Sequence, residues 1–169
     1  MMCPTIRTKQ YKNTVKRAFT TPFCIVEKRT EKAMDYFCPQ MTLNEVNAMS
    51  MLGLAHIGDG VYELLTRTML CKQGHSAAAK LHRMTVSYVN APAQAAAAKK
   101  IMPALTAQEL AVYKRGRNAK VNSVPQKATE GEYHAATGLE ALFGWLYLQG
   151  MTERIDALFS MIMEDNDAA

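Results

Sequence analysis

The amino-acid sequence predicts an all-α protein, on two observations. Thr42, Thr106 and Thr129 each stand three residues before a glutamate. This is the pattern of a capping box, in which the Thr oxygen accepts from a backbone amide and the Glu reaches back. No segment alternates apolar and polar residues over a strand length. The 169 residues suit one domain, so we expect a bundle of about five to seven helices from Thr42 onward.

The helix expected over residues 52–70 carries the first functional candidate, Asp59. Its predicted core face consists of residues at helical spacing, namely Ile57, Val61, Leu64, Leu65 and Thr68. Asp59 lies on another face, one turn from Glu63, where like charges are unfavourable unless a cation or donor lies between them. Gly58 and Gly60 flank Asp59, although a glycine inside a helix costs about 1 kcal/mol relative to alanine. The bare backbone indicates a close approach, either by another helix or by a ligand.

The later helices have their own start and stop signals. Pro92 fits the first turn of a helix capped by Asn90 or Ala91, and Thr152 is expected to cap a last helix towards Glu164. Three glycines stand where helices are expected to end: Gly74, Gly116 and Gly150.

Residues 1–33 form a segment of different composition from the domain expected over residues 34–169. The segment carries eight Lys or Arg and two Glu, a net charge of +6, whereas residues 34–169 carry twelve bases and thirteen acids, a net charge of −1. Without a sustained apolar period, residues 1–33 are predicted to be disordered. A basic nucleic-acid tail, a cleaved transit sequence and an over-extended gene start before Met34 all fit. We expect a dispensable tail or a wrong start.

Cysteine spacing and hydropathy exclude other classes. Cys3, Cys24, Cys38 and Cys71 form no C-x-x-C pair, which argues against a zinc ribbon or a secreted disulfide scaffold and predicts a reducing, cytoplasmic location. The longest uncharged run, Met84–Ala98, has fifteen residues, fewer than the roughly 18–20 that a spanning helix needs. We therefore expect no membrane segment.

The second functional candidate, Glu140, is the only charged residue in the segment 133–149. Because this segment is apolar on nearly all sides, it predicts a central helix. An unpaired carboxylate buried there would cost several kcal/mol or be neutralised through a raised pKa. Ala136 and Gly144, one turn before and after, leave room for a ligand or a second carboxylate. A bond to a backbone group or a Tyr hydroxyl would equally satisfy Glu140.

Three segments taken together resemble Mini-ribonuclease III, the short bacterial branch of the ribonuclease III family, which lacks the C-terminal double-stranded-RNA-binding domain of larger members. They are residues 52–64 with Gly-Asp-Gly, 113–120 with Arg-Gly-Arg-Asn, and 136–148, within a resemblance over about residues 35–165. The resemblance implies an all-helical ribonuclease III endonuclease domain, active as a homodimer, that cuts double-stranded RNA with Mg²⁺. The implied substrate is the 23S ribosomal RNA precursor, and a large-subunit ribosomal protein is a further candidate partner.

The resemblance also assigns residues. The signature Asp falls on Asp59 and the signature Glu on Glu140, which become the predicted catalytic residues and Mg²⁺ ligands. Two further carboxylates of the larger enzymes fall on Ala55 and Thr137 here, so more of the metal shell must be water or phosphate oxygen. This fits Mg²⁺, which is typically held by one or two carboxylates plus substrate phosphate.

The strongest basic cluster of the near-neutral domain lies at residues 114–120, before a long loop over residues 118–131. The residues expected to bind RNA are Arg115, Arg117, Asn118 and Lys120. A-form RNA is recognised by shape through its wide minor groove, which suits a few such side chains on a projecting loop. Near a helix C-terminus, these cations would also simply complement the helix dipole.

The four histidines, His56, His75, His82 and His134, lack metal-ligand spacing, and we expect mostly structural roles, with His56 and His82 within reach of RNA. Two other functions remain open. A catalytically silent module of the same fold would bind structured RNA or ribosomal protein, but it has no reason to hold two carboxylates. A helical protein-interaction domain would leave the basic loop and Glu140 unexplained.

Overall fold

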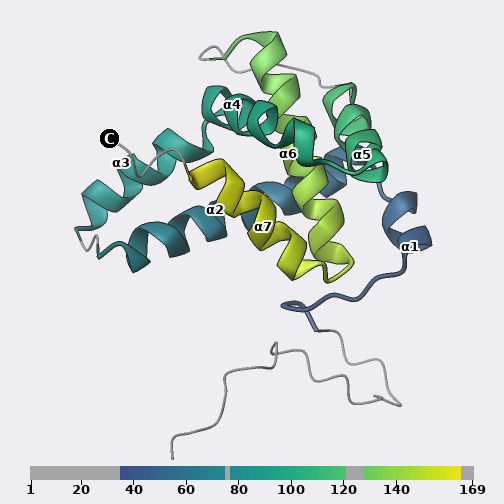
Figure 1. The fold of residues 1–169 in the computed structure, drawn as a ribbon, viewed down its shortest axis with the longest axis horizontal. Helices are drawn as coiled ribbons and strands as arrows, with labels where there is room; N and C mark the ends of the chain where they lie inside the picture. Colours follow the sequence, from purple (N-terminus) through teal and green to yellow (C-terminus); the bar gives the residue numbers. More distant parts are fainter. Residues whose placement is uncertain (1–34, 75–76, 121–127, 165–169) are drawn as a thin grey trace, which may run out of the picture. The chain divides into compact units, whose positions relative to one another are not determined.

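The computed structural model describes residues 35–74, 77–120 and 128–164, and all regular structure in these ranges is helical. The elements, in chain order (Figure 1), are α1 (Leu43–Ala48), α2 (Met51–Lys72), α3 (Ala78–Val89), α4 (Ala91–Ile101), the 3₁₀ turn η1 (Met102–Ala104), α5 (Ala107–Arg117), α6 (Glu130–Leu148) and α7 (Thr152–Met163). The predicted all-α fold is confirmed. The basic segment 1–33 and loop residues 121–127 lie outside the described residues. Within the described ranges, no helix is both long and apolar enough to cross a membrane.

The predicted capping boxes are all present. The side chains of Thr42, Thr106 and Thr129 accept from the backbone N–H three residues on, and each glutamate in return accepts from the threonine N–H, at 2.8, 2.8 and 2.9 Å. Asn90 caps α4 by accepting from the N–H of Ala93 at 2.9 Å. Local sequence signals therefore place these helix starts correctly.

Two of the predicted helix boundaries need correction. Thr152 is the first residue of α7 and Met151 is its N-cap, without a side-chain hydrogen bond. Gly116 lies inside α5, where a Cβ atom would stand 2.6 Å from the Cβ of Ala141 on α6. That glycine is needed for helix contact rather than for a stop. Gly74 and Gly150, in contrast, have left-handed φ values of 84° and 73° just beyond helix ends, as predicted.

The central element is α6, shown in light green in Figure 1, which passes between α5 and α4 and crosses α2. Eleven of its nineteen residues are buried, which confirms the expected central helix. Tyr62 of α2 packs edge-on against Phe143 of α6 and Phe159 of α7, with ring centroids 5.4 and 5.7 Å apart. The core therefore forms around α6, with α2 and α7 held to it by aromatic contacts.

The core face predicted for residues 52–70 is wrong. The buried residues of α2 are Leu54, Ala55, Gly58, Tyr62, Thr66 and Leu70. On the predicted face, Ile57, Val61 and Leu65 only partly pack against the core, Leu64 is 60 % exposed, and Thr68 is exposed. The reason is the crossing with α6, where a Cβ on Gly58 would overlap the carbonyl oxygen of Glu140, and one on Gly144 that of Leu54. Small residues on the adjoining face let two backbones touch, and this contact, rather than the larger side chains, decides which face is buried.

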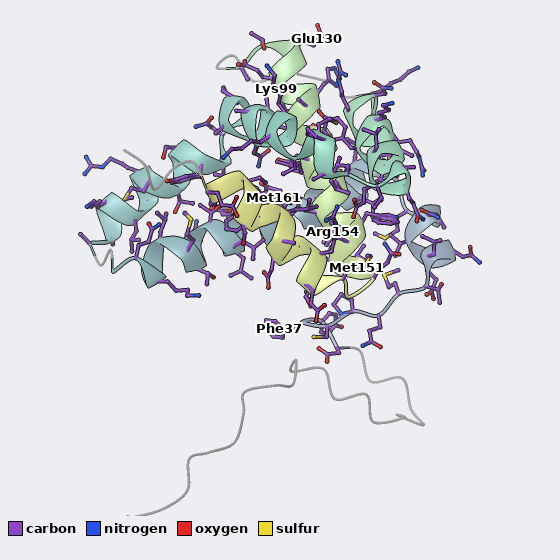
Figure 2. All side chains as sticks on the ribbon, viewed as in Figure 1. Phe37, Lys99, Glu130, Met151, Arg154 and Met161 are labelled. Carbon is purple, nitrogen blue, oxygen red and sulfur yellow. The ribbon has the colours of Figure 1, made fainter. Side chains whose placement is uncertain are left out.

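A buried ion pair joins α5 to α7. Glu109 is 3 % exposed, and its two carboxylate oxygens accept from Nε and Nη2 of Arg154, each at 2.8 Å. Nη2 of Arg154 also donates to the carbonyl oxygen of Ala104 at 2.8 Å. Figure 2 labels Arg154 on α7. Arg154 thereby joins α7 to both η1 and α5.

Candidate functional site

The crossing of α2 and α6 brings the two candidate carboxylates to one place. Asp59 directly follows Gly58, and Gly58 contacts the backbone of Glu140. Asp59 and Glu140 both line a surface pocket of about 270 Å³, together with Leu52, Ala55, His56, Tyr133 and Thr137. At Gly60, by contrast, a Cβ atom would meet nothing within 4 Å. The approaching group at Gly58 is a helix, and that helix carries Glu140.

The two positions without carboxylates belong to the same pocket. Ala55 and Thr137 line it, and the Thr137 hydroxyl donates to the carbonyl oxygen of Tyr133 at 3.0 Å. In the described ranges, no group of three or more His, Cys, Asp or Glu is placed to hold a metal ion. Two carboxylates on an open pocket are a donor set that suits Mg²⁺, which keeps several waters and takes up phosphate oxygens.

The electrostatics of the pocket favour a cation. Burial raises the pKa of the Glu140 carboxyl to about 7, and the negative charge of Asp59 adds to the rise. The pKa of Asp59 is also raised, by burial first and by Glu63 second, while His56 opposes the rise. No Lys or Arg is among the described residues that line the pocket. Two carboxyls with raised pKa values in one pocket that no described Lys or Arg lines are typical of a functional site.

Sequence reasoning missed Gln94 of α4. This side chain is 1 % exposed, and its amide lies against Glu140, where it counters the rise of the pKa. Nevertheless, Nε2 of Gln94 has no partner of ordinary hydrogen-bond geometry among the described residues. The only sequence signal was one amide side chain within the alanine-rich segment 91–98.

The predicted RNA-binding residues lie at the C-terminal end of α5. Arg115, Arg117, Asn118 and Lys120 are all exposed, and Asn118 is the C-cap. Arg117 and Asn118 line a second depression of about 450 Å³ with Glu130, Gly131 and His134, at the end of α6 that Glu130 marks in Figure 2. Arg115 and Lys120 are not part of its lining.

Consecutive residues of α6 line the two pockets. Tyr133 lines the carboxylate pocket, and the next residue, His134, lines the basic one. His134 lies 3.7 Å from the carboxylate of Glu130. Of the other histidines, His56 lines the carboxylate pocket, and His82 is exposed on α3. His75 lies outside the described residues.

Comparison with known proteins identifies the same regions. The model of the Ribonuclease III domain matches residues 52–151, a range that contains both carboxylates and the basic cluster. A Mini-ribonuclease 3 from Symbiobacterium thermophilum is 49 % identical over 104 residues, covering 62 % of this chain and 80 % of the relative. A Mini-ribonuclease 3 from Thermoanaerobacter sp. is 40 % identical over 124 residues, covering 73 % and 87 %.

A solved structure agrees with the fold. The crystal structure of a Fusobacterium nucleatum protein superposes with a TM-score of 0.66 at 30 % sequence identity, over 72 % of this chain and 93 % of that chain. The matched domain and the named relatives confirm the predicted family resemblance. The chain belongs to the ribonuclease III family, in its Mini-ribonuclease 3 branch, and is an endoribonuclease.

Proposed function

We propose that this endoribonuclease cleaves double-stranded RNA with Mg²⁺ and that it matures the 23S ribosomal RNA precursor in the cytoplasm. The observation that carries the proposal is the pairing of Asp59 and Glu140 in one pocket that no described Lys or Arg lines. The names of the relatives and the matched domain support RNA as the substrate. The 23S precursor and a large-subunit ribosomal protein as partner are proposed on the family resemblance.

Asp59 and Glu140 are the proposed catalytic residues, and they would hold the metal. Bound Mg²⁺ would polarise the scissile phosphate, activate a water molecule and stabilise the leaving 3′ oxygen. The chain itself contributes the placement of two carboxylates by the backbone contact at Gly58. Ala55 and Thr137 occupy the pocket without adding charge, which leaves coordination positions for water and phosphate oxygens.

The test is cleavage of a perfect RNA duplex by the purified chain, with Mg²⁺ and with EDTA. We expect Asp59→Asn and Glu140→Gln each to lower kcat at least about 10³-fold, roughly 4 kcal/mol, while duplex binding persists. Glu153→Gln, an exposed carboxylate on α7, is the matched control and should keep full activity. Binding without cleavage by the parent chain would favour the silent RNA-binding module instead.

The basic cluster is proposed to contact the RNA backbone. Arg115, Arg117 and Lys120 are exposed at the C-terminal end of α5, and Arg117 lines the depression there. Replacing all three with alanine should weaken duplex binding and flatten its salt dependence, because each lost phosphate contact lowers the slope by roughly 0.9 on the B-DNA scale. An unchanged slope would show that the cluster does not touch RNA.

We further propose a homodimer, in which a second site cuts the antiparallel strand. Leu64, 60 % exposed, and Leu52, 45 % exposed, leave an apolar part of α2 uncovered in the single chain. Leu64→Glu should shift the mass measured by light scattering towards the monomer. A parent chain that is monomeric at micromolar concentration and fully active would contradict this.

Residues 1–33 are proposed to be dispensable beside the domain over residues 34–169. A chain that starts at Met34 should cleave duplex RNA within about tenfold of the full chain at about 0.15 M salt, because ions screen the attraction of a basic segment. A larger loss would make the segment a working part of the enzyme.

A further inference from the structure

Gln94 is a buried polar side chain that the fold does not explain. It lies on the first turns of α4, where its N–H donates to the carbonyl oxygen of Asn90 at 3.0 Å. Its side chain is 1 % exposed, and Nε2 has no hydrogen-bond partner among the described residues. An unpaired buried donor costs about 1–3 kcal/mol, so an apolar residue of the same size would stabilise the fold better.

The Glu140 carboxylate is the acceptor that suits this donor. α4 packs along α6, and the side-chain amide of Gln94 lies within reach of the Glu140 carboxylate. An amide N–H can only donate and an ionised carboxylate can only accept, so the two groups are complementary. The Gln94 side chain lies against Glu140, but Nε2 falls short of ordinary hydrogen-bond geometry with any described acceptor.

The helix that carries Gln94 is anchored at both ends. Asn90 accepts from Ala93 at the start of α4 and donates from Nδ2 to the carbonyl oxygen of Val86 at 2.9 Å. Near the other end, Nζ of Lys100 donates to the carbonyl oxygen of Ile162 at 2.8 Å. Gln94 therefore lies on an anchored helix, as residues that orient metal ligands usually do.

We propose that Gln94 is a positioning residue whose Nε2–H group holds one carboxylate oxygen of Glu140 and leaves the other free to face Asp59 across the pocket. The inference rests on the proposed metal-dependent cleavage. It assigns Gln94 no contact with RNA or metal, so Gln94 acts only through Glu140.

The test replaces Gln94 by an apolar residue of similar length. Gln94→Met removes the donor with little change of volume, and Gln94→Leu is a second replacement if the first folds poorly. Thr85→Val is the matched control, since Thr85 is also a buried polar residue but donates to Leu81 of its own helix at 2.9 Å. For each chain, kcat and KM for duplex RNA are measured, together with the thermal unfolding midpoint in EDTA and in Mn²⁺.

We expect Gln94→Met to lower kcat by about 10–100-fold, the usual range for groups that orient metal ligands, with KM within about twofold. Its unfolding midpoint in EDTA should stay close to that of the parent, because the lost contact with Glu140 and the removed cost of burying an amide offset each other. The rise of the midpoint on adding Mn²⁺ should shrink, because a ligand stabilises in proportion to its affinity. Thr85→Val should keep kcat and the Mn²⁺ effect.

Three outcomes would overturn the proposal. The first is a Gln94→Met chain with parental kcat and a parental Mn²⁺ effect. The second is a loss of activity that a lower unfolding midpoint in EDTA explains completely, because a residue with a purely structural role gives this result. The third is a parent chain that neither cleaves nor gains stability with Mn²⁺, which removes the metal site itself. If the parent gains stability with Mn²⁺ but does not cleave, the proposed function fails and the Mn²⁺ effect alone decides the role of Gln94.

Discussion

Two glutamates withdrawn from water, Glu109 and Glu140, are treated in opposite ways by this fold. Glu109 receives both donors of the Arg154 fork and the N–H of Thr106, and these partners lower the pKa of its carboxyl. Burial first, and the negative charge of Asp59 second, raise the pKa of the Glu140 carboxyl to about 7. The comparison teaches that the fold gives a counter-charge to the carboxylate that holds helices together and gives none from a described Lys or Arg to the one in the pocket.

The two regions also differ in what brings the charges together. Glu109 and Arg154 attract each other, so their contact contributes to folding once the donors are satisfied. Asp59 and Glu140 repel each other and are held together by the backbone contact at Gly58 and Gly144. Helix packing therefore bears the free-energy cost of the pocket, and a bound cation would relieve it.

The largest expected effect is on the free energy of unfolding, which substitutions of the two glutamates should change in opposite directions. Glu109→Gln leaves the guanidinium of Arg154 without its counter-charge, and breaking a buried pair destabilises by about 3–5 kcal/mol. Glu140→Gln removes an uncompensated charge and should stabilise the metal-free chain at about pH 8, since its carboxyl would then be ionised. Urea unfolding measures both. Equal effects of the same sign would break the comparison.

The next effect is the pH dependence of stability in EDTA. Glu140 has a folded pKa of about 7 against 4.5 for the ordinary group. Its contribution is therefore fully present below pH 4.5 and is lost as the pH rises to about 7. The loss amounts to at most about 3 kcal/mol, less for a half-buried and coupled group. Glu109, with a lowered pKa, loses its contribution only as the pH falls below the ordinary value.

The measurement is a series of thermal or urea unfolding curves across this pH range. The parent chain should lose stability between pH 4.5 and about 7, and Glu140→Gln should flatten that part of the profile. Added Mg²⁺ should restore stability near neutral pH in the parent only, because the metal favours the ionised carboxylate. A parent profile that rises through the same range would contradict the assignment.

A smaller effect tests the helix contact that forces the carboxylates together. Gly58→Ala places a methyl group on the carbonyl oxygen of Glu140, and such overpacking costs about 1–3 kcal/mol. Gly60→Ala is the matched control, because nothing lies within 4 Å of its Cβ position. That control should gain up to about 1 kcal/mol of helix propensity. If both substitutions stabilise the chain, the contact at Gly58 is looser than described.

Local signals predicted the helices well and one helix face poorly. The three capping boxes and the Asn90 cap depend on residues three or four apart, so the sequence contains everything needed to place them. The face of α2 depends on which neighbour it meets. Large side chains at Ile57 and Leu64 suggested one face, whereas Ala55 and Gly58 on the other allow α6 to approach.

The candidate site was predictable for a different reason. Asp59 and Glu140 stood out as carboxylates beside small residues, and the family resemblance paired them. Their meeting in one pocket is a tertiary fact that the structure supplies. The contact of Gln94 with Glu140 and the Glu109–Arg154 pair each join elements that are distant in sequence. The amino-acid sequence alone carries no signal for such contacts.

The uncompensated charge of Glu140 also has an evolutionary consequence. Because a neutral residue at Glu140 would stabilise the fold, mutations that abolish catalysis here are favoured by stability rather than opposed by it. Descendants of such an enzyme would lose their nuclease activity readily and still fold. A lineage that keeps Asp59 and Glu140 together must therefore be held there by continuing selection for the reaction, since nothing in the folding of the chain protects the pair from drift.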